Sequence, residues 1–124
     1  MERVVVTDRE RVAQVLDEAV EAAIAGDVQR VLDTLSPNAT EARNRLERVL
    51  QRYEVRDVKL RQMRIVVERR VDPPLAEATF RAVVSGRDRA GRLPRETMVG
   101  RVTVELRLED GQWCVVDFET AEGP

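Results

Sequence analysis

A β-hairpin is predicted for Val102 to Glu119, which reads VTVELRLEDGQWCVVDFE. Its first half alternates apolar and polar residues, so one face of that strand is apolar and the other is polar. Asp110 and Gly111 supply a two-residue turn, because both residue types tolerate the positive φ angles that such turns need. A strand with one polar face is typical of an antiparallel sheet whose other face is covered. The first 53 residues hold the only remaining amphipathic material that could cover it.

Three amphipathic helices are predicted within those residues. Thr7 to Glu10 reads TDRE, the pattern of a capping box at the start of a helix. Apolar residues then recur at helical spacing as far as Gly26, where the helix should end, and Asp27 can cap the next one. Ser36 and Pro37 should end or redirect this short second helix. Thr40 is a candidate cap for the third helix.

From Glu54 onward the apolar residues recur at every second position, which predicts strands. Their parity slips by one near Gln62, and this slip indicates a bulge in the first strand. Asp72 to Pro74 should form a turn before a strand over Leu75 to Ser85, whose inner face carries mainly alanines and should leave space beneath it. We expect a loop over Gly86 to Pro94, a further strand from Thr97, and a tail over residues 121–124.

This order of elements predicts an α+β fold in a single domain over residues 1–124. Three N-terminal helices would pack on one face of a curved antiparallel sheet of four strands.

Composition excludes several kinds of chemistry. The chain has no histidine, so a Ser-His-Asp triad, a Cys-His pair and a histidine-ligated metal are ruled out. Cys114 is the single cysteine and has no partner for a disulfide or a metal site. The net charge is −2, which favours neither nucleic acid nor a membrane as a partner. We therefore expect no metal, no cofactor and no nucleic-acid or membrane partner. Without a signal-like segment, a cytoplasmic protein is expected.

Three segments resemble the nuclear transport factor 2-like superfamily, which includes polyketide cyclase-like and steroid isomerase-like proteins. They are AAIAGDVQRVLDTLSPNAT, EARNRLERVLQRYEVRDVKLRQMRIVVE and the closing LEDGQWCVVDFE. The resemblance implies a cystatin-like cone of curved sheet closed by helices, with a pocket for a small apolar ligand. It also implies a homodimer formed through the outer face of the sheet. In this chain the pocket-lining side chains would be Leu35, Tyr53, Phe80, Leu106 and Trp113.

The chain departs from the catalytic patterns of that superfamily. It lacks the histidine that cyclase-like members carry near the last strand, and its first helix lacks the tyrosine of steroid isomerase-like members. Asp117 and Tyr53 are the remaining weak candidates for acid–base catalysis. Pairing across a two-residue turn would place Val104 opposite Asp117 and aim this carboxylate inward, where burial would raise its pKa. Alternatively, a bulge at Gly111 would leave Asp117 at the polar edge of the sheet.

Three functions stay open at this point. One is a non-catalytic domain that binds a small molecule, and another is a small dehydratase or isomerase using Asp117 and Tyr53. The third is a dimerising scaffold, for which apolar residues on the outer sheet face would be needed; the candidates are Val83, Val99, Cys114, Val116 and Phe118. An arginine-rich loop, with Arg87, Arg89, Arg92 and Arg95, could hold a phosphate. We favour a solvated hairpin tip instead, because Asp88 and Glu96 dilute the positive charge.

Overall fold

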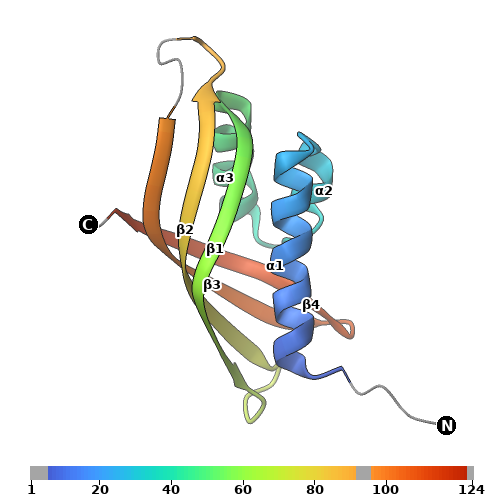
Figure 1. Ribbon diagram of the computed structural model, residues 1–124. Helices are drawn as coiled ribbons and strands as arrows, with labels where there is room; N and C mark the ends of the chain where they lie inside the picture. Colours follow the sequence, from blue (N-terminus) through green and yellow to red (C-terminus); the bar gives the residue numbers. More distant parts are fainter. Residues whose placement is uncertain (1–5, 92–95, 123–124) are drawn as a thin grey trace, which may run out of the picture.

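The computed structural model describes residues 6–91 and 96–122 and shows an α+β fold (Figure 1). Three helices precede four strands. In chain order the elements are α1 (Asp8–Ile24), α2 (Val28–Leu32), α3 (Thr40–Arg52), β1 (Tyr53–Glu68), β2 (Leu75–Asp88), β3 (Glu96–Glu109) and β4 (Gln112–Glu122).

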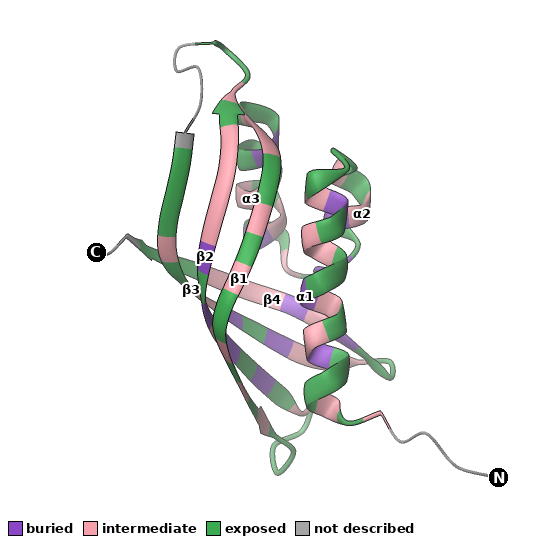
Figure 2. Cartoon of the chain, viewed as in Figure 1, coloured by how far each residue is buried: buried purple, intermediate pink, exposed green. Residues whose placement is uncertain are grey.

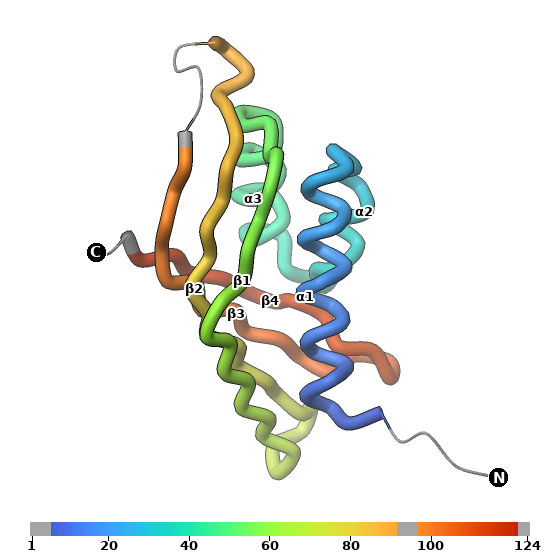
Figure 3. The backbone as a smooth tube through the Cα atoms, in the orientation of Figure 1, coloured from blue at the N-terminus to red at the C-terminus, as the bar shows by residue number. Residues whose placement is uncertain are grey.

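The four strands form one antiparallel sheet in the order β1-β2-β3-β4, so each strand pairs with its neighbour along the chain. The sheet is strongly bent. Figure 3 shows β3 running beside β2 in its first part and then turning, with β4, toward α1. All three helices lie on one side of this bent sheet, which leaves its other side, the outer face, uncovered by the described chain (Figure 1). The predicted fold class is confirmed.

The helix boundaries follow local capping chemistry. The Thr7 hydroxyl accepts a hydrogen bond from the backbone N–H of Glu10 at 3.2 Å, which confirms the capping box. Gly26 follows α1 with a positive φ of 73°, and the Asp27 carboxylate caps α2 by accepting from the N–H of Arg30 at 3.1 Å. The Thr40 cap is wrong, because α3 already begins at Thr40 and its N-cap residue, Ala39, makes no side-chain bond.

A single main core joins the helices to the inner face of the sheet. Figure 2 shows its buried positions on the strands and on the side of α1 that faces them. Burying a large apolar side chain stabilises the folded state by roughly 1.5–3 kcal/mol, so this cluster is the main source of stability. Its buried members are Val12, Leu16, Leu35, Ala42, Ala76, Ala78, Phe80, Ala82, Val104, Leu106, Trp113 and Val115. A smaller cluster, Ala22, Val31 and Leu50, connects the ends of the helices.

The first strand contains the predicted irregularity. Gln62 has a positive φ of 56°, and the pairing of β1 with β2 shifts between Arg61 and Arg64. This bulge lets apolar side chains on both sides of it point toward the helices. The strand β2 extends to Asp88, three residues beyond the predicted end, because Gly86 pairs with both Val55 and Glu96.

The loop and the tail at the other strand ends are only partly described. Within the predicted arginine-rich loop, Arg92 and Arg95 lie outside the described residues. Arg87 forms an ion pair with Glu54, and Arg89 donates to the carbonyl of Leu50 near the end of α3. The predicted tail is corrected at its start, because β4 continues to Glu122, while residues 123–124 lie outside the described part.

No helix in the described part of the chain is both long enough and apolar enough to span a membrane.

Candidate functional site

The predicted pocket residues divide into two groups. Leu35, Phe80, Leu106 and Trp113 are all buried and belong to the main core, where they pack with Val12 and Leu16 of α1. The alanines of β2 belong to the same cluster, so helical side chains occupy the space predicted beneath them. Tyr53, in contrast, is only partly buried and lies where α3 passes into β1.

Tyr53 lies between two surface pockets. The first, of about 610 Å³, is rimmed by arginines of α3 and by the end of β2; it is lined by Arg45, Arg48, Val49, Gln51, Arg52, Tyr53, Asp88, Arg89 and Ala90. The second, of about 300 Å³, is a crevice whose exposed wall is mainly polar; it is lined by Ala23, Ile24, Ala25, Gly26, Asp27, Val28, Val31, Leu50, Tyr53, Glu54, Val55 and Arg89. The four buried candidates line neither pocket.

Of the two directions considered for Asp117, inward and outward, the structure shows the outward one. The last hairpin turns at Asp110 and Gly111 as predicted, and Leu108 lies opposite Trp113 and Leu106 opposite Val115. The register then shifts, so that Val116 bulges and Val104 pairs with Phe118. Asp117 therefore pairs with Glu105 on the outer side, and its side chain is 49% exposed. The bulge lies at Val116, whereas the alternative considered from the sequence placed one at Gly111.

The Asp117 carboxylate holds the edge of the sheet to α3. It accepts a hydrogen bond from the Arg45 guanidinium at 3.1 Å and another from the backbone N–H of Phe118 at 2.9 Å. The same guanidinium stacks over the Phe118 ring, 4.3 Å from its centroid, and donates to the Phe118 carbonyl. Phe118 itself packs against the main core, so it does not contribute to the outer face.

Asp117 and Tyr53 do not share a pocket. Arg45, the partner of Asp117, precedes Tyr53 by eight residues, a separation of about 12 Å along a helix axis. Tyr53 lines both pockets described above, whereas Asp117 lines neither. The structure thus gives Asp117 a role in holding Arg45 and does not bring the two candidate residues together.

Trp113 is anchored through its indole nitrogen. The Nε1–H donates to the Asp8 carboxylate at 3.3 Å, and the same carboxylate accepts two hydrogen bonds from Arg69, at 2.6 and 2.7 Å. These hydrogen bonds from Arg69 hold the pKa of Asp8 below its ordinary value. The group links the start of α1, the segment after β1 and the start of β4, so its role is to fix the helices on the sheet.

The free edge of β4 is closed by the chain itself. The N–H of Ser36 donates to the Val115 carbonyl at 2.7 Å, and the N–H of Val115 donates to the Thr34 carbonyl at 2.9 Å. The Ser36 hydroxyl is buried and donates to Glu109 at 2.7 Å. Because an unpaired strand edge invites pairing with another chain, this cover excludes strand addition along the middle of β4.

The outer face of the sheet carries an ordered pattern of charge. Arg81 lies directly opposite Arg101 on the neighbouring strand, and two residues along, Thr79 lies opposite Thr103. Two residues further, Glu77 lies opposite Glu105. Like charges directly opposite one another destabilise a sheet. This face has two such pairs, one of two arginines and one of two glutamates, so its charges are arranged unfavourably when the face is isolated.

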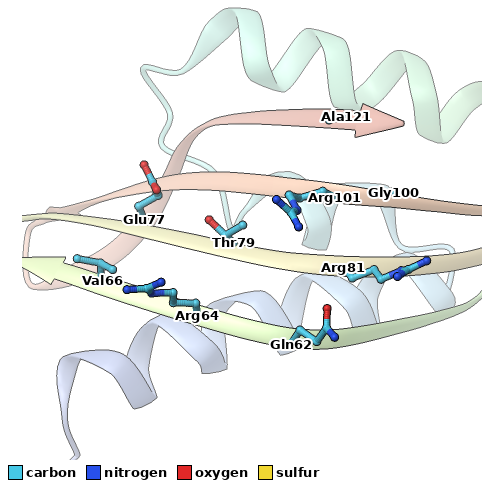
Figure 4. A pocket seen from close by; sticks show the side chains of 9 residues that line it. All are labelled: Gln62, Arg64, Val66, Glu77, Thr79, Arg81, Gly100, Arg101 and Ala121. Carbon is cyan, nitrogen blue, oxygen red and sulfur yellow. The ribbon is translucent and has the colours of Figure 1, made fainter. Parts of the chain in front are cut away.

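A hollow of about 630 Å³ lies on this face (Figure 4). Small residues, Thr79, Gly100 and Ala121, contribute to its wall beside longer charged ones; the full lining is Gln62, Arg64, Val66, Glu77, Thr79, Arg81, Gly100, Arg101 and Ala121. Figure 4 shows these side chains on the side of the strands away from the helices. No ion pair within the described residues involves Arg64, Arg81 or Arg101.

Sequence reasoning missed this surface. The alternation in β2 placed Glu77, Thr79 and Arg81 on one face, but it said nothing about their neighbours on β3. Only the register of β2 with β3 shows that each charge meets its like.

Comparison with known proteins supports the fold and little else. No protein-family model matches the sequence, and no curated protein is significantly similar to it. Solved structures do match. A provisionally assigned aromatic ring hydroxylase of Novosphingobium aromaticivorans has a TM-score of 0.73 at 15% identity, covering 97% of this chain and 92% of its own.

Two further structures are similar over most of their length. A provisionally assigned calcium/calmodulin-dependent protein kinase II association domain of Xanthomonas campestris has a TM-score of 0.71 at 16% identity, covering 96% of this chain and 90% of its own. A nuclear transport factor 2-like protein with a cystatin-like fold, from Novosphingobium aromaticivorans, has a TM-score of 0.67 at 15% identity, covering 93% and 81%. This chain therefore has the cystatin-like fold of nuclear transport factor 2-like proteins.

Proposed function

We propose that this chain is a non-catalytic scaffold domain that forms a homodimer through the outer face of its sheet. The observation that carries the proposal is the charge pattern of that face, in which arginines and glutamates lie opposite their own kind and the arginines have no ion-pair partner among the described residues. A surface that carries charges of both signs is self-complementary when the two copies are oriented so that opposite charges meet, and a two-fold dimer needs a self-complementary surface.

The other side of the sheet supports the same proposal. The side chains predicted to line an inner pocket are packed in the main core, and Asp117 is engaged by Arg45. An acid–base enzyme using Asp117 and Tyr53 would need both groups in one cavity, which is not their arrangement here. A small ligand is compatible with the proposal through the crevice of about 300 Å³ beside Tyr53, whose lining residues are separate from those of the outer-face hollow; its mainly polar exposed wall does not favour the small apolar ligand expected from the sequence.

The structural similarities are consistent with an assembly role. The Xanthomonas campestris structure is described as an association domain, and it covers nearly the whole of this chain.

Sedimentation equilibrium tests the proposal directly. At 10–100 μM protein and low salt, we expect the mass of two 14.1 kDa chains. A change of Arg81 and Arg101 to alanine should weaken the dimer, while Arg48→Ala and Arg52→Ala on α3 should leave it unchanged. A wild-type protein that stays monomeric at several hundred micromolar would contradict the proposal.

A further inference from the structure

We infer that the two copies pack with their two-fold axis along the row formed by Thr79 and Thr103, so that Arg81 faces Glu77 of the second copy and Arg101 faces Glu105. This inference rests on the proposed homodimer and specifies its partner surface. It gives each of these exposed charges a partner of opposite sign.

The outward side chains of β2 show why this axis is favoured. In order they are Leu75, Glu77, Thr79, Arg81 and Val83. The order is therefore apolar, acidic, polar, basic, apolar, with Thr79 at the centre. When two such strands face each other in antiparallel directions, with Thr79 against Thr79, Glu77 of each copy meets Arg81 of the other. Leu75 of each copy likewise meets Val83 of the other.

The neighbouring strand has the same centre. Its outward residues are Val99, Arg101, Thr103, Glu105 and Arg107, and Thr103 lies directly opposite Thr79. Arg101 and Glu105 therefore stand on either side of the same row, each about 7 Å from it at the strand rise of about 3.4 Å per residue. One axis therefore brings acid onto base on both strands, although nothing in the register of a monomer requires their centres to coincide. At the outer positions of β3 the same axis brings Val99 onto Arg107, so apolar residues meet only on β2.

A competing axis is disfavoured by charge. If the two-fold ran parallel to the strands, between β2 and β3, Arg81 would face Arg101 and Glu77 would face Glu105. All four contacts would then be repulsive, and repulsion between like charges discriminates strongly against a wrong arrangement. The charges select the axis that crosses the strands.

The hollow on this face suits such packing. Facing sheets lie about 10 Å apart, a distance that two long side chains meeting end to end can bridge. Thr79, Gly100 and Ala121 leave space between the longer side chains, so arginines and glutamates of the second copy could enter (Figure 4). The middle of β4 is already covered by Thr34 and Ser36, and this favours contact through the face over contact through that edge.

A free small anion is the alternative occupant of the hollow, and Arg64 separates the two readings. Arg64 lies opposite Thr79 on β1, at the edge of the sheet, and it lines the hollow with Arg81 and Arg101. A bound anion would use all three arginines. In the proposed dimer Arg64 lies on the axis row, beside its own copy at the rim, and has no glutamate to pair with.

Charge exchange between two variants tests whether these four charges hold the two copies together. Arg81→Glu with Arg101→Glu makes the central face acidic, and Glu77→Arg with Glu105→Arg makes it basic. We expect each variant alone to self-associate at least tenfold more weakly than the wild type. An equimolar mixture should form a heterodimer with an affinity near that of the wild-type homodimer. A mixture that stays monomeric would overturn the inference, and so would either variant that dimerises like the wild type.

Two single-chain swaps then test the register itself. Arg81→Glu with Glu77→Arg exchanges residues that face each other, so it should restore dimerisation. Arg81→Glu with Glu105→Arg has the same composition but exchanges residues that do not face each other, so it should stay impaired. The reverse result would refute this axis. Arg64→Glu should change the dissociation constant less than twofold, and a loss as large as that of the acidic variant would indicate an anion site instead.

Chemical cross-linking gives a readout that does not depend on affinity. With Cys114→Ser as background, Thr79→Cys should cross-link to its own copy through a short bifunctional maleimide, because both thiols would lie near the axis. Lys59→Cys, outward-facing on β1, is the matched control and should not. Efficient cross-linking at position 59 but not at 79 would overturn the axis while leaving the dimer intact. A monomeric wild type would instead overturn the proposed function.

Discussion

The two faces of the sheet are built from the same strands but depend on different partners. On the inner face, β2 presents alanines and Phe80 to α1 and the other helices, and these residues are at most 7% exposed. On the outer face, the residues between them are charged or polar, and none of the helices in the described part of the chain covers them. The inner face finds its complement within the chain. The outer-face arginines, Arg81 and Arg101, have no ion-pair partner among the described residues. The inner face therefore stabilises the fold, whereas the outer face is the surface through which we propose that the protein dimerises.

The largest effect should come from Leu106 on the inner face. It is fully buried at the centre of the main core. Leu106→Ala should lower the free energy of unfolding by about 2–5 kcal/mol, the usual range for such a truncation with its residual cavity. Lys59→Ala, at an exposed outward position on β1, is the matched control and should stay within about 0.5 kcal/mol. Urea unfolding measures both. Equal losses would mean that the two faces do not differ as described.

Much of the inner face could be predicted from the sequence because its signals are local. The capping box at Thr7, the turn at Asp110 and Gly111, and the parity slip at Gln62 each depend on a few neighbouring residues, and all three are confirmed. The bulge at Val116 could not be predicted in the same way. Val115 and Val116 are both apolar, so the alternation gives no sign of which one faces inward.

The charge pattern of the outer face was harder to predict because it depends on which residues of β2 and β3 pair with each other. The loop between β2 and β3 is long, so the sequence does not fix which residue of β3 meets Arg81. A change of one residue in that register would place Arg81 beside Val102 or Gly100 and remove the like-charge pairs. The candidate site therefore needed the structure, whereas the fold class did not.

A smaller effect, with a characteristic pH dependence, is expected where the helices are tied to the ends of the sheet. Asp8 accepts from Arg69 and Trp113, so Asp8→Asn should cost about 1 kcal/mol near pH 7. The pKa of Asp8 is lowered in the folded state, mainly by the hydrogen bonds from Arg69. Its contribution is therefore complete above the ordinary pKa of about 3.9 and is lost as the pH falls through the lower, folded value.

Unfolding measured at several pH values checks this prediction. The gap in stability between wild type and Asp8→Asn should be constant from about pH 5 to 7 and should shrink below about pH 4. Arg69→Gln should show the same loss near neutral pH. A gap that widens on acidification would contradict the assignment of this carboxylate as a stabilising partner of Arg69.

The smallest effect is expected at Asp117, on the outer side of the edge strand. Its ion pair with Arg45 joins two side chains that are 49% and 37% exposed, and exposed pairs typically contribute about 0.2–1 kcal/mol. Asp117→Asn keeps an oxygen that can accept from the N–H of Phe118, so only the charge is lost. Arg45→Ala should cost more than Asp117→Asn, because it also removes the stacking on Phe118 and the bond to its carbonyl. If Asp117→Asn instead lowered stability as much as Leu106→Ala, the carboxylate would have to be a buried member of the core. The outward register set by the bulge at Val116 would then be wrong, and so would the division between the two faces.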